Sequence, residues 1–131
     1  MPAIPLVLLV EDDEQQSNLF AEILRLNGLD VVEANDGYTA IDAAQAKTPD
    51  IVVLDLMLPG MTGLQVAKIL KRQPNTAAIP IIAISGQSAT GVGHEAVTAG
   101  CVTYFKKPYS PMTLVAEIKH WLLDRGRQPQ S

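Results

Sequence analysis

A chain of 131 residues is long enough for one domain with its own core, and 47% hydrophobic with 18% charged residues is an ordinary globular composition. The net charge of −4 argues against direct binding of nucleic acid, and a single cysteine excludes an internal disulfide. No stretch approaches the roughly 20 apolar residues of a membrane span, and the N-terminus lacks the basic start of a signal peptide. We therefore expect a cytoplasmic protein.

The chain opens with a short apolar run, Leu6–Val10, whose length and β-branched residues predict a buried strand. An unbroken run of this kind suits a parallel sheet that is covered on both faces. A run of acids, Glu11–Glu14, follows where this strand should end. Because adjacent carboxylates repel one another, we expect a positive group between them, most simply a divalent cation.

Strands and helices alternate along the rest of the chain. Apolar runs predict further strands over residues 29–34, 51–54, 81–84 and 102–106. Apolar spacing, caps and stop signals predict helices over residues 15–27, 37–46, 63–73, within 86–99, and from 110 to 123. The alternation predicts a doubly wound parallel α/β fold with right-handed crossovers. Residues 1–123 should form one domain, and residues 124–131 a short flexible tail.

Polar residues collect where the predicted strands end. Asp12 and Asp13 follow the first strand, Asp55 ends the third, Ser85 the fourth and Lys107 the fifth. Ligands of open parallel sheets bind beyond the carboxyl ends of the strands, so these groups should share one crevice. Three carboxylates, a hydroxyl and an ammonium could hold Mg²⁺ together with a phosphoryl group, and a central carboxylate could accept that group.

These motifs resemble those of response regulator receiver domains of two-component signal transduction, such as the chemotaxis regulators. The resemblance is carried by the acidic turn, by Asp55–Gly63, by Ser85–Gly86 and by Lys106–Pro108, in the family's order and approximate spacing. It implies a flavodoxin-like (βα)5 sandwich whose five parallel strands have the order 2-1-3-4-5.

The resemblance also implies the chemistry of the site. Asp55 would accept a phosphoryl group from a sensor histidine kinase or a histidine phosphotransfer protein. Asp13, Asp55 and the backbone carbonyl of Met57 would ligate Mg²⁺ or Mn²⁺, and Asp12 would act mainly through a bound water. Glu11 receives no ligand role in this interpretation.

The same resemblance implies how a signal would leave the site. Ser85 and Lys107 would hold the phosphoryl oxygens, and Tyr104 would be the switch aromatic that follows the serine. The fifth strand and its two flanking helices would bind a downstream protein target, and the protein would be a monomer or a weak dimer. Such a domain changes its partners rather than turning over a substrate, and catalyses only its own phosphorylation and dephosphorylation.

Other interpretations stay open. Asp12 and Asp13 could be the N-cap and first-turn acid of the following helix. Ser85 could be an ordinary strand-end serine, and Tyr104 a half-buried strand aromatic. For the whole chain, the alternatives are a metal-dependent phosphohydrolase with an aspartate nucleophile in the first acidic turn, and a degenerate receiver that acts as a constitutive scaffold.

Overall fold

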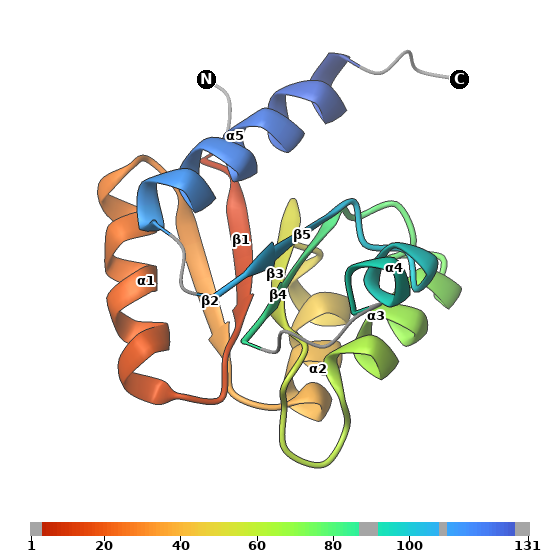
Figure 1. The fold of residues 1–131 in the computed structure, drawn as a ribbon. Coiled ribbons are helices and arrows are strands. Elements are labelled where there is room, and N and C mark those ends of the chain that lie inside the picture. Colours follow the sequence, from red (N-terminus) through yellow and green to blue (C-terminus); the bar gives the residue numbers. More distant parts are fainter. Residues whose placement is uncertain (1–3, 87–91, 108–109, 128–131) are drawn as a thin grey trace.

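The structure is a computed structural model, and it describes residues 4–86, 92–107 and 110–127 (Figure 1). The predicted alternation of strands and helices is confirmed. The elements are β1 (Leu6–Val10), α1 (Glu14–Leu26), β2 (Asp30–Ala34), α2 (Gly37–Lys47), β3 (Ile51–Asp55), α3 (Gly63–Arg72), β4 (Ile81–Ser85), α4 (Val92–Thr98), β5 (Thr103–Lys106) and α5 (Pro111–Arg127).

The five strands form one parallel sheet of order β2-β1-β3-β4-β5, as the resemblance implies. This order makes β1 and β3 neighbours in the sheet, although α1, β2 and α2 separate them in the sequence. Val10 of β1 pairs with Leu54 of β3. The next residue along each strand, Glu11 and Asp55, therefore reaches the carboxyl edge of the sheet beside the other.

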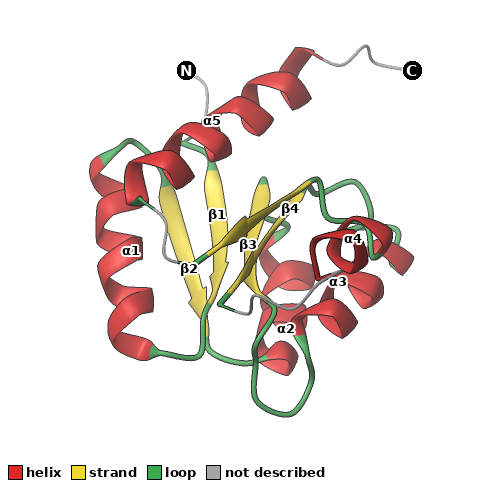
Figure 2. Ribbon diagram, in the orientation of Figure 1, coloured by secondary structure: helices red, strands yellow, loops and turns green. Residues whose placement is uncertain are grey.

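Helices cover both faces of the sheet, with α1 and α5 on one face and α2, α3 and α4 on the other (Figures 1 and 2). Because side chains alternate along a strand, Val7 and Leu9 of β1 pack under α1 and α5, while Leu8 and Val10 pack under the other layer. Burial on both faces explains why the strands are continuous apolar runs in the sequence.

The buried face of α1 differs from the stripe of large apolar residues that the spacing predicts. The predicted stripe comprises Leu19, Phe20, Ile23, Leu24 and Leu26. Of these, Leu24 is buried and Phe20 and Ile23 are partly buried against the core, whereas Leu19 and Leu26 are exposed, at 55% and 79%. Ser17 and Ala21 are buried as well. Residues three and four apart lie on the same face of a helix, and in α1 this spacing is compatible with two overlapping stripes of residues. Apolar spacing alone could not decide which stripe meets the sheet.

The last helix is longer than predicted. It runs to Arg127, so residues 124–127, which were predicted to lie in the tail, are helical. These positions contain no proline, and the one glycine, Gly126, lowers helix propensity by only about 1 kcal/mol. Although α5 is the longest helix, neither it nor another helix in the described part of the chain has the length and apolarity to cross a membrane.

Candidate functional site

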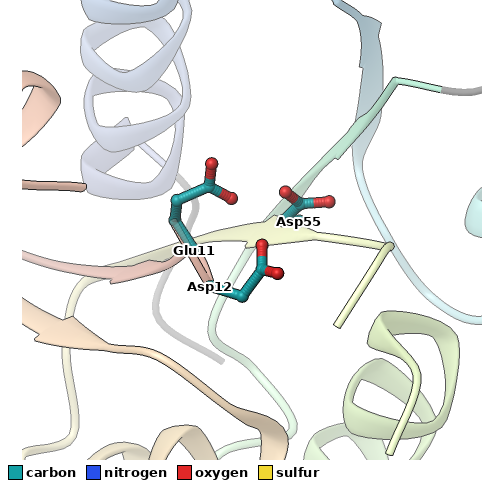
Figure 3. A group of neighbouring side chains, drawn as sticks. All are labelled: Glu11, Asp12 and Asp55. Carbon is teal, nitrogen blue, oxygen red and sulfur yellow. The ribbon is translucent and has the colours of Figure 1, made fainter. Parts of the chain in front are cut away.

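Three carboxylates meet at the carboxyl edge of the two central strands (Figure 3). Glu11, Asp12 and Asp55 each place an oxygen within 4.8 Å of those of the other two. Glu11 and Asp55 are buried, whereas Asp12 is exposed. Carboxylate oxygens of this kind are the ligands that Mg²⁺ prefers in proteins. The acids that follow the first and third strands therefore share one crevice, as the strand-end rule predicts.

Asp13 lies outside this acidic cluster, so the structure does not bring it together with the other predicted ligands. It is the N-cap of α1, and its Oδ1 accepts hydrogen bonds from the backbone N–H groups of Gln15 at 3.0 Å and Gln16 at 3.3 Å. The carboxylate thereby satisfies two donors that the first turn of a helix otherwise leaves unpaired. Of the two interpretations that the sequence left open for Asp13, the structure shows the cap.

Glu11 takes the place beside Asp55 in this cluster, although the interpretation of the sequence gave it no ligand role. Its N–H donates to the carbonyl of Ala34 at 3.0 Å, so the β1–β2 ladder continues one residue beyond Val10. Its side chain therefore follows the alternation of the strand. The sequence is compatible with this position, because residues two apart on a strand share a face. Leu9 and Glu11 are related in this way, as are Val53 and Asp55.

Asp55 is held by a contact on each of its oxygens. Its Oδ1 accepts a hydrogen bond from the backbone N–H of Met57 at 2.8 Å, and its Oδ2 lies 3.0 Å from Nζ of Lys107. The same Nζ lies 3.4 Å from Oε1 of Glu11. Lys106, the neighbouring lysine, is exposed. One ammonium thus lies between two buried carboxylates, which fixes the orientation of Asp55.

The electrostatics of the cluster favour an additional cation. Burial, together with the hydrogen bond and the charge of Asp55, raises the pKa of Glu11 to about 8, although Lys107 acts in the opposite direction. Burial lowers the pKa of Lys107, but its contacts with Asp55 and Glu11 outweigh this effect and raise it. Among the described residues, the buried Oε2 of Glu11 has no hydrogen-bond partner. An unsatisfied buried carboxylate oxygen between acids fits a divalent cation.

The cavity behind the cluster is small. Its volume is about 10 Å³, and Glu11, Ser17, Phe20, Asp55 and Lys107 are among the residues that line it. This is about the space that one water needs, far less than a phosphate ester would occupy. Among the described residues, this cavity is therefore too small to hold the phosphate ester that the alternative of a phosphohydrolase would need.

The remaining predicted residues surround the cluster. Ser85 is buried at the end of β4, and its carbonyl accepts a hydrogen bond from the N–H of Lys107 at 2.7 Å. Tyr104 is partly buried in β5, and its ring lies against Gly93 of α4, where an added Cβ would come within 3.2 Å of the ring. The side chain of Met57 is 50% exposed, and its backbone contacts Asp55.

The chain is similar in sequence to known proteins. The family model of the response regulator receiver domain matches residues 7–119. The chain is 32% identical over 118 residues to the polar-differentiation response regulator DivK of Brucella anthropi, a match that covers 90% of this chain and 96% of the relative.

Solved structures have the same fold. The chemotaxis response regulator CheY4 of Vibrio cholerae has a TM-score of 0.84 and 25% identity, over 91% of this chain and 99% of that one. A CheY-like receiver domain protein of Methanospirillum hungatei has a TM-score of 0.91 at 20% identity, over 97% and 100% of the two chains, and is similar in fold. The sheet order and the five covering helices are therefore those of known receiver structures.

Proposed function

The chain belongs to the response regulator receiver domain family, and we propose that it acts as a phosphorylation-controlled switch whose phosphoryl acceptor is Asp55. Receiver domains are signalling domains and not metabolic enzymes, and they bind Mg²⁺ at an acidic pocket. The observation that carries the proposal is the position of Asp55, a buried carboxylate beside two further acids and the ammonium of Lys107.

In the proposed reaction, an oxygen of Asp55 attacks the phosphorus of a phosphohistidine. The bond between phosphorus and the histidine nitrogen breaks, and its electron pair returns to the imidazole. Lys107 is already within hydrogen-bond distance of Asp55, so its ammonium would hold a phosphoryl oxygen and offset the charge that spreads over the group. The hydroxyl of Ser85, at the end of the neighbouring strand, would hold another.

We assign the metal to Glu11, Asp12 and Asp55, with the backbone carbonyl of Met57 as a further oxygen ligand. When bound, Mg²⁺ or Mn²⁺ would neutralise the crowded carboxylates and the incoming phosphoryl oxygens. The unpaired Oε2 of Glu11 supports this assignment. Asp13 stays the cap of α1 and is not proposed as a ligand.

The proposed output uses Ser85 and Tyr104. Phosphorylation would draw the serine toward the new group, and Tyr104 would follow by changing its packing against α4, which shifts an existing equilibrium between two conformations. A downstream protein would then bind the face formed by β5, α4 and α5. The phosphoryl donor would be a sensor histidine kinase or a histidine phosphotransfer protein in the cytoplasm, and the switch itself would be a monomer or weak dimer.

The test is an intact-mass measurement of the chain after incubation with Mg²⁺ and acetyl phosphate. We expect one phosphoryl group to be added to the parent protein and none to Asp55→Asn, which keeps the shape but removes the nucleophile. A mass gain that persists in Asp55→Asn, or none in the parent, would refute the proposal. Sustained turnover of a phosphate ester would favour the alternative of a phosphohydrolase. Undetectable Mg²⁺ binding would favour the alternative of a degenerate receiver.

A further inference from the structure

A second hollow lies between the N-terminal turn of α2, the β3–α3 loop and the outer face of α3, two helices that lie side by side (Figure 1). We call it the α2–α3 groove. Its volume is about 410 Å³, and its lining includes Tyr38 of α2, Met61 of the loop, and Gln65, Lys68 and Arg72 of α3. No lining residue is acidic, although the chain carries a net charge of −4.

The cations of the α2–α3 groove are arranged along one stripe of α3. Lys68 and Arg72 are four residues apart, so they lie one above the other, and like charges at this spacing destabilise a helix. The dipole of α3 favours Arg72 in its last turn, but this effect fades over one turn and does not account for Lys68. Within the described part of the chain, neither side chain makes an ion pair or a hydrogen bond. An external anion would relieve this repulsion.

Polar and apolar groups accompany the two cations. The Oε1 atom of Gln65 accepts the N–H of Thr62 at 2.9 Å in the capping box of α3, which leaves the Nε2 group of the same amide as a donor. Tyr38 is 66% exposed, and Met61 and Ile69 are partly buried. The groove therefore combines two positive charges and a donor with an aromatic ring and an apolar floor.

The walls of the α2–α3 groove are held firmly together. Gly37, the first residue of α2, packs so closely on α3 and the loop that an added Cβ would lie 2.9 Å from Val66 and 3.0 Å from Met61. The capping box fixes the start of α3 in the same region. Because both walls belong to packed helix ends, a ligand would meet a largely preformed surface, which lowers the entropic cost of binding.

We propose that the α2–α3 groove binds an acidic segment of a partner protein, with two carboxylates on Lys68 and Arg72 and an apolar side chain on Tyr38 and Met61. Two cations are fewer than the clusters of four to eight that read as binding sites for anionic lipid. The overall negative charge disfavours nucleic acid. The proposal concerns a different surface from the acidic cluster and does not depend on phosphorylation of Asp55.

The probes are short peptides in which two glutamates flank one leucine, with the glutamates placed from two residues to one helical turn apart. Each is titrated into the full ¹⁵N-labelled chain without Mg²⁺ or phosphodonor, and backbone resonances are followed. We expect saturable shifts in Tyr38, Met61 and the outer stripe of α3 with at least one peptide. Lys68→Gln/Arg72→Gln should weaken the apparent Kd roughly tenfold, since two exposed ion pairs are lost.

The matched control is Lys47→Gln/Lys119→Gln, which removes the same charge from exposed lysines outside the groove. It should leave the Kd within about twofold, and the spectra of both double variants report whether they remain folded. Absence of saturable shifts with every peptide would overturn the proposal. Equal affinity for peptides in which glutamine replaces glutamate would also overturn it, as would an equal loss of affinity in the control variant. The same holds if phosphatidylglycerol vesicles shift these resonances and the peptides do not.

Discussion

Glu11 and Asp13 are two positions apart in the same acidic turn, yet they do different things. Glu11 extends the β1 ladder by a hydrogen bond to Ala34, and its buried side chain lies beside Lys107. Asp13 has left the strand and satisfies donors at the start of α1. Which of these acids enters the cluster depends on where the strand ends. A hydrogen bond to β2 sets that end, and although the alternation of Leu9 and Glu11 agrees with it, the local sequence does not show where the strand stops.

Substitutions in the acidic turn separate the two roles. Glu11→Gln should weaken Mg²⁺ binding by about tenfold or more, because a charged ligand becomes neutral. Asp13→Ala should leave Mg²⁺ affinity unchanged and lower the free energy of unfolding by about 1 kcal/mol through loss of the cap. Calorimetric titration and urea denaturation measure the two effects. A loss of Mg²⁺ affinity in Asp13→Ala comparable to that in Glu11→Gln would show that Asp13 was wrongly left out of the proposed metal ligands.

The raised pKa of Glu11 predicts a pH dependence of stability. The ordinary pKa is 4.5 and the folded value about 8, so the folded chain retains a proton that the unfolded chain releases between these values. Without Mg²⁺, the free energy of unfolding should fall as the pH rises from about 4.5 through about 8, by at most about 1.4 kcal/mol per pH unit.

In the proposed site, bound Mg²⁺ needs the ionised carboxylate of Glu11, so Mg²⁺ affinity should rise over the same interval. Glu11→Gln should flatten both profiles, because glutamine does not titrate in this range. Urea denaturation at several pH values, with EDTA or with Mg²⁺, provides the comparison. Profiles that are equally steep in the parent and in Glu11→Gln would assign the dependence to another group.

At the scale of elements, the fold followed from the sequence more directly than the site did. Each strand is buried on both faces and therefore reads as an apolar run, with Gly, Pro and Asp at the turns between elements. The strand-end rule located Asp12, Asp55 and Lys107, since each follows or ends an apolar run. The face of α1 was predicted only in part, because it depends on packing, and the helical end of α5 was not predicted, because it depends on the absence of a helix breaker.

The β3–α3 connection brings α3 against the backbone of the proposed acceptor. A Cβ added at Gly63 would lie 2.5 Å from the carbonyl oxygen of Asp55 and 2.5 Å from Cα of Leu56. The N–H of Gly63 donates a hydrogen bond to the carbonyl of Leu56 at 3.1 Å. Gly63→Ala should therefore lower the free energy of unfolding by about 2 kcal/mol or more, because backbone atoms must move.

Gly86→Ala is the control for this effect, since among the described residues its Cβ would meet only Lys107 Cδ at 3.8 Å, an ordinary contact. Urea denaturation of both variants, followed by circular dichroism, makes the comparison. If Gly63→Ala were as stable as Gly86→Ala, the close approach of α3 to Asp55 would be wrong.

At the scale of the whole molecule, the parallel sheet assigns different tasks to different edges and faces. The carboxyl edge of β1 and β3 gathers the acids, β5 with α4 and α5 forms the proposed output face, and α2 with α3 forms the basic groove. The sequence could indicate the first of these, because its residues directly follow the strands. The groove needed the structure, because Tyr38 and Lys68 line one hollow only through the packing of α2 beside α3.

The central claim is that Asp55 carries the phosphoryl group. Borohydride reduces an aspartyl phosphate to homoserine, so the chain can be phosphorylated with acetyl phosphate and Mg²⁺, reduced, digested and mapped by peptide mass. We predict homoserine at position 55 alone, and none when EDTA replaces Mg²⁺. Homoserine at Asp12 or Asp13, or its complete absence from a chain that binds Mg²⁺, would contradict the account.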